Sequence, residues 1–400
     1  MVGEQLRIFD TTLRDGEQAP GFSLRINEKI QMARQLDTLG VDIIEAGFPI
    51  ASKDDAESVR RVAQEVTRPV IASLARCRRA DIECAGEAIM KAERGRIHTF
   101  LATSDLHLKH KLHMSREQCQ EAAVDGVKLA RQYTDNVQFS AEDALRTAVD
   151  FLCQVVEATI TAGATTINLP DTVGYSTPDE IFDFFTTITT RVPNAHKAVF
   201  SAHCHDDLGL AVANTLAALR AGVRQVECTI NGIGERAGNA SLEEIVMATR
   251  VRSDRLPFAT QINTQAIYAT SQLLTALTSE AVQANKAIVG RNAFAHEAGI
   301  HQDGMLKDRR TYEIMKPEDV GVSQTTLVLG KHSGRHAVQN RCEELGYKLS
   351  RYELDQIYQR MIRLADAQKN IGDDDLVAMI EEVRAEQTEL ESKTAGATSV

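Results

Sequence analysis

Residues 166–205, TINLPDTVGYSTPDEIFDFFTTITTRVPNAHKAVFSAHCH, contain the repeating unit that decides the fold. A short apolar run at 166–172 is followed by a helical stretch that opens at Thr177-Pro178-Asp179-Glu180, with proline in its first turn. A second apolar run follows at 199–205. Two such runs joined by a helix predict parallel neighbouring strands in a βαβ unit.

The same alternation extends outward in both directions, from residue 5 to about residue 250. The predicted strands are 6–10, 42–47, 70–74, 96–102, 136–142, 166–172, 199–205 and 225–232. Eight strand–helix units close naturally into an α/β fold of the (β/α)₈ (TIM) barrel type. An open, doubly wound sheet is the alternative, but no G-x-G-x-x-G turn follows the first predicted strand.

The alternation ends beyond residue 255. Helices are expected at 263–277 and 354–369, and the loops between them contain Gly290, Gly299, Gly304 and Gly330. We therefore predict a barrel domain at 1–260 and a mostly helical C-terminal region at 261–385. The polar, small residues at 386–400 predict a flexible tail.

Composition and charge restrict the partners that can be expected. The 400 residues are 43% hydrophobic and 25% charged, as in ordinary globular proteins. A net charge of −11 argues against nucleic acid or an anionic membrane as a partner. The seven cysteines form no C-x-x-C motif, the N-terminus begins as a strand rather than a targeting peptide, and no run is apolar enough to span a membrane. These features predict a cytoplasmic protein.

Chemically active side chains gather where the predicted strands end, and in a barrel these ends meet at one mouth. His203 and His205 lie two residues apart on one strand, so both imidazoles can point the same way and hold one divalent cation. Asp15 follows the first strand and Asn239 the eighth, close to that pair in a closed barrel. This convergence disfavours the alternative of two buried histidines satisfied by polar neighbours. Such ligands suit Zn, Mn, Co or Fe, and Mg less well, so the metal is not selected.

Arg14, beside Asp15, offers a fixed positive charge for a substrate carboxylate or a developing oxyanion. The alternative is a structural ion pair with Glu45 or Glu142, and the two roles are compatible. Three further residues at strand ends can line a pocket or merely cap the strands: Ser140, Asn168 and Thr172.

Three motifs at these positions resemble the 2-isopropylmalate synthase family, within the wider group of homocitrate, citramalate and methylthioalkylmalate synthases. They are DTTLRDGEQ at 10–18, HCHDDLGLAVAN at 203–214 and NGIGERAGN at 231–239. The similarity covers roughly residues 5–380 and includes HEAGIHQDG at 296–304. The motifs LPDTVGY at 169–175 and RIHTF at 96–100 favour the isopropylmalate branch.

The resemblance implies a Claisen-type condensation in which acetyl-CoA, 3-methyl-2-oxobutanoate and water give 2-isopropylmalate and CoA, the first committed step of leucine synthesis. It implies a divalent cation (Mn, Mg, Zn or Co) bound by Asp15, His203 and His205, with Asn239 in or near the shell. Arg14 would stabilise the enolate or alkoxide, and Glu142 and Glu235 would transfer protons. The residues implied for the 2-oxo acid pocket are His98, Ser140, Asn168 and Thr172, and we expect Leu74 to line the pocket with them.

The resemblance also implies a homodimer with shared active sites, because it assigns His301 and Tyr312 of the helical region to a neighbouring barrel. Long members of the family carry a C-terminal leucine-sensing domain. Since the sequence ends at Val400, soon after the helical region, we expect no inhibition by leucine.

Two other classes of function remain as alternatives. An acyl-CoA lyase of the same barrel superfamily is disfavoured by residues 299–304, because such lyases are shorter and lack this segment. A non-enzymatic 2-oxo acid sensor is disfavoured by the intact ligand set together with Arg14 and Glu142. Within the family, methylthioalkylmalate, citramalate and homocitrate synthases leave the choice of 2-oxo acid open.

Overall fold

The computed structural model describes residues 3–323, 326–327, 329–330, 332–367 and 371–397. The chain divides into two compact units. The first unit contains Met1–Val282 and Ala287–Val289, and the second contains Gln283–Lys286 and Gly290–Val400.

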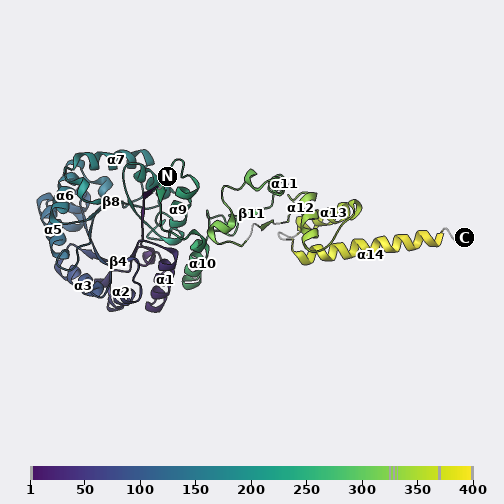
Figure 1. Ribbon diagram of the computed structural model, residues 1–400, viewed down its shortest axis with the longest axis horizontal. Coiled ribbons are helices and arrows are strands. Elements are labelled where there is room, and N and C mark those ends of the chain that lie inside the picture. Colours follow the sequence, from purple (N-terminus) through teal and green to yellow (C-terminus); the bar gives the residue numbers. More distant parts are fainter. Residues whose placement is uncertain (1–2, 324–325, 328, 331, 368–370, 398–400) are drawn as a thin grey trace. The chain divides into compact units, whose positions relative to one another are not determined.

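The first unit is built on a closed barrel of eight parallel strands (Figure 1). The strands neighbour one another in chain order, and β2 pairs with β9 to close the barrel, with Asp10 opposite Cys228. The predicted (β/α)₈ barrel is therefore confirmed. The strands are β2 (Arg7–Asp10), β3 (Ile43–Glu45), β4 (Val70–Arg76), β5 (Gly95–Ala102), β6 (Val137–Glu142), β7 (Thr166–Asp171), β8 (Val199–Cys204) and β9 (Gln225–Cys228).

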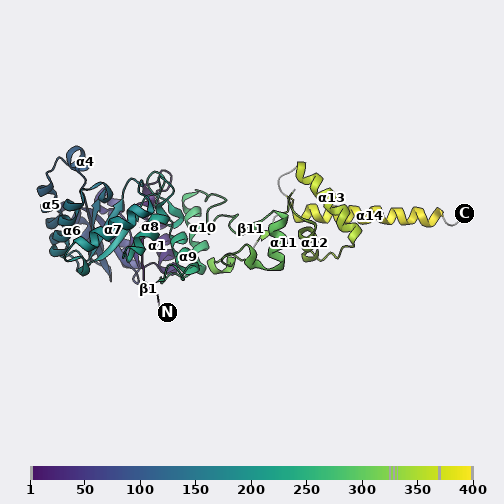
Figure 2. The same ribbon diagram turned by 90° about the horizontal axis from the view of Figure 1, so that it is seen from above.

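Helices surround the barrel, as Figures 1 and 2 show for this unit. Helix α7 illustrates how the sequence sets them: Thr177 and Glu180 form a capping box, Pro178 occupies the first turn, and Phe185 lies in the core. The helices that follow the strands are α1 (Ile26–Leu39), α2 (Lys53–Glu65), α3 (Arg79–Ile89), α4 (Asp105–His107), α5 (Arg116–Ala130), α6 (Val149–Ala162), α7 (Pro178–Arg191), α8 (Ala211–Arg220) and α9 (Leu242–Val251).

Helix α10 (Ile267–Thr278) also belongs to the first unit, although the sequence predicts a boundary at residue 260. Its side chains explain this grouping. Ile267 and Leu274 are buried, and the Ser271 hydroxyl donates a hydrogen bond to Asn231 Oδ1 at 2.6 Å. At the start of the chain, β1 (Glu4–Gln5) pairs in parallel with β10 (Phe258–Ala259).

The second unit is mostly helical. It contains α11 (Gly299–Lys307), α12 (Arg335–Glu344), α13 (Arg351–Ala367), α14 (Asp373–Ala397) and a short parallel pair, β11 (Ala295–His296) with β12 (Thr326–Leu327). Val338, Ile357 and Ile380 lie in the core formed by α12, α13 and α14. The predicted helix end at residue 369 lies outside the described residues.

Helix α14 includes residues 386–397, where the sequence analysis expects a flexible tail. These residues are rich in glutamate, glutamine, leucine, lysine and alanine, which have high helix propensity and can prolong a helix that packing has already started. Among the described residues, no helix combines the length and the apolar character needed to cross a bilayer. All seven cysteines are free thiols.

Candidate active site

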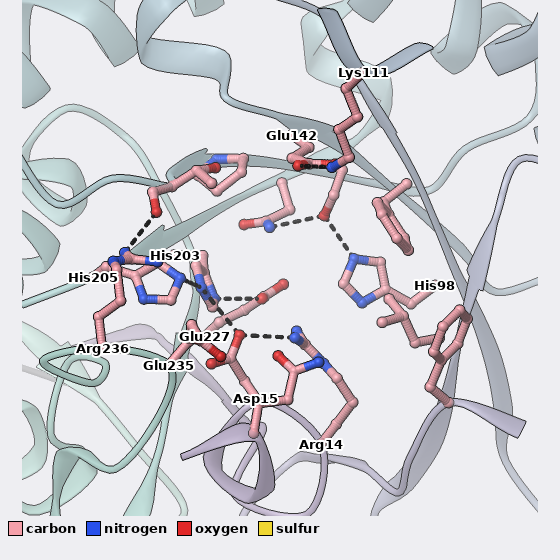
Figure 3. A pocket seen from close by; sticks show the side chains of 18 residues that line it. Arg14, Asp15, His98, Lys111, Glu142, His203, His205, Glu227, Glu235 and Arg236 are labelled. Carbon is pink, nitrogen blue, oxygen red and sulfur yellow. Dashed lines mark hydrogen bonds and ion pairs between the residues drawn. The ribbon is translucent and has the colours of Figure 1, made fainter. Parts of the chain in front are cut away.

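A pocket of about 380 Å³ opens at the carboxyl ends of the barrel strands (Figure 3). It collects side chains from most strands of the barrel, as expected for this fold. Nearly all the residues singled out in the barrel sequence line it: Arg14, Asp15, Leu74, His98, Ser140, Glu142, Asn168, Thr172, His203, His205 and Glu235. The sequence analysis therefore located this pocket through residues that lie far apart in the chain.

Asp15, His203 and His205 form a compact group of potential metal ligands. Their ligand atoms lie within 4.8 Å of one another, and all three side chains are buried. His203 Nε2 is 3.1 Å from His205 Nε2 and 3.7 Å from Asp15 Oδ2. His203 is the penultimate residue of β8. His205 forms an isolated bridge with Asn239, which brings the segment after β9 against the group.

The donor set of this group fits a divalent cation. Two ligand nitrogens about 2.1 Å from one ion and at right angles would be about 3 Å apart, close to the separation of the two Nε2 atoms. Asn239 Oδ1 is buried and has no hydrogen-bond partner among the described residues, although its Nδ2 donates to Asp15 Oδ1 at 2.9 Å. Burial, with His203 nearby, lowers the pKa of His205 to about 3, so this imidazole is neutral and able to ligate.

The charge of Asp15 also suits a metal ligand. Burial alone would raise its pKa, but the Arg14 guanidinium and the neighbouring histidines hold the pKa well below its usual range. Arg14 donates to Asp15 Oδ2 at 2.7 Å. Asp15 therefore remains an anionic oxygen donor across the physiological range of pH.

Arg14 is held by a second carboxylate on its other side. Its Nε donates to Glu45 Oε2 at 2.6 Å, so the predicted structural ion pair with Glu45 exists. Burial opposes the charge of Glu45, but Arg14 and His98 lower its pKa to about 2. The alternative pairing of Arg14 with Glu142 is absent among the described residues, because Glu142 bonds instead to Lys111 Nζ at 2.6 Å.

A chain of polar side chains continues from Glu45 along one wall of the pocket. His98 Nδ1 lies 2.5 Å from Glu45 Oε1, and His98 Nε2 lies 2.6 Å from the Ser140 hydroxyl. Asn168 Nδ2 donates to Ser140 Oγ at 2.8 Å. Thr172 differs from these three, since its hydroxyl accepts the backbone N–H of Asp143 at 2.9 Å and thus caps a strand end.

The sequence analysis missed several residues that line the pocket: Gln18, Phe48, Phe100, Lys111, Pro170, Glu227 and Arg236. Glu227 is the most informative of them. Its Oε2 lies 2.9 Å from His203 Nδ1, the position of a carboxylate that orients a metal-binding histidine. An acidic residue in the predicted strand 225–232, whose other residues are uncharged, was the signal that could have revealed it.

His301 and Tyr312 belong to the second unit, which is described by itself. His301 lies on α11, and its ring centroid is 4.3 Å from that of Tyr312. Tyr312 is 44% exposed. Their participation at a neighbouring barrel stays a prediction.

Comparison with known proteins first assigns the chain to a broad class of barrel proteins. Residues 5–274 match the family model described as HMGL-like, and residues 288–369 match the model described as homocitrate synthase post-HMGL domain-like. HMG-CoA lyase from Bacillus subtilis shares the fold, with a TM-score of 0.61 and 18% identity, over 73% of this chain and 98% of that one. The carboxyl transferase domain of Rhizobium etli pyruvate carboxylase has a TM-score of 0.54 and 16% identity, over 90% of this chain and 56% of that one.

Sequence relatives narrow the class to one family. The 2-isopropylmalate synthase of Carboxydothermus hydrogenoformans is 61% identical over 95% of this chain and 74% of its own length. The 2-isopropylmalate synthase of Rhodopseudomonas palustris strain BisB18 is 57% identical over 95% of this chain and 73% of its own length. The chain therefore belongs to the HMGL-like family and, within it, to the 2-isopropylmalate synthases.

Proposed function

We propose that the chain condenses acetyl-CoA with 3-methyl-2-oxobutanoate and water to give 2-isopropylmalate and CoA, the first committed step of leucine synthesis. The observation that carries this proposal is the group Asp15, His203 and His205 beside the Arg14–Glu45 pair, at the mouth of a barrel shared with 2-isopropylmalate synthases. This combination offers both a cation site and a fixed positive charge for an oxo acid substrate.

Asp15, His203 and His205 would hold the divalent cation (Mn, Mg, Zn or Co), and Asn239 would support Asp15 or join the shell. A bound cation would act as a Lewis acid toward the keto group of a 2-oxo acid. Both histidine Nε2 atoms face the same place, while His203 Nδ1 is engaged by Glu227. The donor set leaves the choice among these cations open.

Arg14 binds and orients negative oxygen in this proposal. Its guanidinium is anchored by Glu45 and Asp15, so its remaining donors are presented in one fixed direction. A substrate carboxylate, or the oxygen that becomes negative as the new C–C bond forms, would be stabilised there. His98, Ser140 and Asn168 would orient the oxo acid through their hydrogen-bonded chain.

The reaction requires a proton to leave the acetyl methyl group before the new carbon–carbon bond forms to the keto carbon. Water then cleaves the thioester and releases CoA, and the alkoxide oxygen gains a proton. We assign these transfers to Glu142 and Glu235, which both line the pocket. Lys111, bonded to Glu142, fixes that carboxylate at the pocket wall.

Apolar side chains support the choice of a branched oxo acid. Leu74, Phe48 and Phe100 line the pocket, and the rings of Phe48 and Phe100 lie 6.4 Å apart. Besides Arg14, the cationic side chains that line the pocket among the described residues are Lys111, which bonds to Glu142, and Arg236, which bonds to Asp207. A second substrate carboxylate would have to compete with one of these carboxylates. This wall suits an isopropyl group better than a charged one.

A panel of 2-oxo acids with acetyl-CoA, read out by the thiol of released CoA, tests the proposal. We expect the highest kcat/KM with 3-methyl-2-oxobutanoate and a much lower value with 2-oxoglutarate. The opposite ranking would assign the chain to homocitrate synthesis, the activity that the name of the second matched family suggests. Absence of CoA release with every oxo acid would contradict a condensing enzyme altogether.

We further propose a homodimer in which His301 and Tyr312 of one protomer assist the barrel of its partner. The support is their exclusion from the barrel unit together with the partial exposure of Tyr312. A mixture of His301→Ala and Arg14→Ala protomers should recover activity that neither variant has alone. No recovery, after subunit exchange is verified, would mean that each site is built within one chain. The free cysteines suit a reducing compartment, so we place the enzyme in the cytoplasm.

A further inference from the structure

Arg96 is a buried guanidinium for which the proposed reaction has no use. It lies on β5 inside the barrel, and its exposed fraction is only 2%. No carboxylate lies within ion-pair distance of it among the described residues; its partners are the side-chain amides of Asn136, Gln138 and Gln225, at 2.8–2.9 Å. Burial, with Arg7 nearby, lowers the pKa of Arg96 to about 9. Burying a charge without an ion pair costs desolvation free energy, which suggests that Arg96 has a function.

The contacts of Arg96 fix which way the Gln138 amide points. Gln138 Oε1 accepts from Arg96 at 2.9 Å and from Gln225 Nε2 at 2.8 Å. Its Nε2 must therefore face the other way, where it donates to Glu227 Oε1 at 2.6 Å and approaches His98 Nε2 at 3.2 Å. A flipped amide would set donor against donor at Arg96 and acceptor against acceptor at Glu227.

Glu227 connects the Gln138 amide to His203 of the metal site. With Oε1 held by Gln138, its Oε2 lies 2.9 Å from His203 Nδ1, where it can accept a hydrogen bond from an Nδ1–H group (Figure 3). A histidine that carries its proton on Nδ1 leaves the Nε2 lone pair for a cation, and His203 Nε2 faces His205 Nε2 and Asp15.

We propose that Arg96 is a positioning residue for the metal site, acting through Gln138 and Glu227 on the orientation and tautomer of His203. The proposal rests on the assignment of Asp15, His203 and His205 as metal ligands. Arginine suits this task because one guanidinium can donate to several amide oxygens at once and keeps its charge. Without this guanidinium, the Gln138 amide would keep only its contacts with Gln225 and Glu227, and Gln225 would lose the donor that orients its own amide oxygen.

The test is a double-mutant cycle on Mn²⁺ affinity in the full chain, measured by electron paramagnetic resonance of free Mn²⁺. The variants are Arg96→Met, Gln138→Met and the two combined. The control is Arg94→Met, two residues away, which removes an exposed guanidinium that donates to the Arg68 carbonyl at 2.9 Å. Circular dichroism verifies the fold of each variant.

Each single variant should bind Mn²⁺ about tenfold more weakly, as is usual when a partner behind a metal ligand is lost. Because both changes break one chain of contacts, the double variant should be no weaker than either single variant, and the control should equal the wild type. Wild-type affinity in either single variant, or losses that multiply in the double variant, would overturn the proposal. If Arg96→Met fails to fold, the Gln138→Met variant decides alone. Unchanged Mn²⁺ affinity in that variant would refute the proposed link from Arg96 through Gln138 and Glu227 to His203. A wild type that binds none of Mn²⁺, Mg²⁺, Zn²⁺ and Co²⁺ would instead refute the metal assignment itself.

Discussion

Replacing Glu45 by glutamine should destabilise the chain by an amount that the structure allows us to work out. Glu45 is fully buried and accepts hydrogen bonds from Arg14 at 2.6 Å and from the Thr11 hydroxyl at 2.7 Å. Glutamine keeps the shape of the side chain but removes the charge that balances Arg14. Breaking a buried ion pair by removing one partner costs about 3–5 kcal/mol.

The pKa of Glu45 gives a second route to the same magnitude. Its fall from 4.5 to about 2 corresponds to about 3 kcal/mol of folding free energy. Because the pKa is lower in the folded state, this stability is complete above pH 4.5 and disappears as the pH falls toward 2. The difference between wild type and Glu45→Gln should therefore be constant from pH 7 to pH 5 and narrow below pH 4.5.

Urea unfolding followed by circular dichroism measures this difference, since the chain contains no tryptophan. The control is Glu57→Gln, which removes a carboxylate paired with Arg60 on the exposed surface of α2 and should leave the unfolding midpoint unchanged. Equal stability of Glu45→Gln and wild type at pH 7, or a difference that stays constant down to pH 3, would refute the reasoning.

Two further substitutions follow from the same structure. Burial, opposed by hydrogen bonds from Thr12, raises the pKa of Asp10 from 3.8 to about 7, so the folded chain retains a proton that the unfolded chain releases. Stability should therefore fall as the pH rises through this window. The stability of Asp10→Asn relative to wild type should increase by about 2 kcal/mol between pH 5 and pH 7 in urea unfolding. A difference independent of pH would refute this. A Cβ added at Gly234 would lie 2.1 Å from Asn239 Nδ2 and 3.0 Å from Asp15 Oδ1, so Gly234→Ala should weaken Mn²⁺ binding about tenfold. At Gly209 an added Cβ would meet nothing within 4 Å, so Gly209→Ala should bind Mn²⁺ as the wild type does. Equal Mn²⁺ affinity of the two variants would contradict the inference that a Cβ at Gly234 disturbs the metal site.

The barrel was predictable because its strands are buried on both faces and appear in the sequence as apolar runs. The run predicted at 166–172 corresponds to β7 at Thr166–Asp171, and the run at 70–74 to the first part of β4 at Val70–Arg76. The run at 225–232 extends too far, since β9 ends at Cys228 and a tight turn at Ile230–Gly232 follows. The β-branched residues Thr229 and Ile230 resemble a continued strand until the backbone is known.

The sequence predicted those residues of the candidate site that lie at strand ends or in known motifs. Asp15, His203 and His205 meet because parallel strands end at one mouth. Glu227 escaped notice because its meeting with His203 depends on register: the two residues are paired across β8 and β9. The partner of Glu142 was also not predictable, since Lys111 lies in the short π-helical segment Leu108–Leu112, whose path the sequence pattern does not define.

The metal content and turnover of His205→Ala provide the most direct measurement. His205 contributes one of the three buried ligand atoms that lie within 4.8 Å of one another. The wild type should bind a single equivalent of Mn²⁺. The variant should keep its circular dichroism spectrum, lose that equivalent, and lose the acetyl-CoA-dependent release of CoA together with it. A folded variant that binds one equivalent of Mn²⁺ and turns over 3-methyl-2-oxobutanoate at the wild-type rate would contradict the assignment of the site.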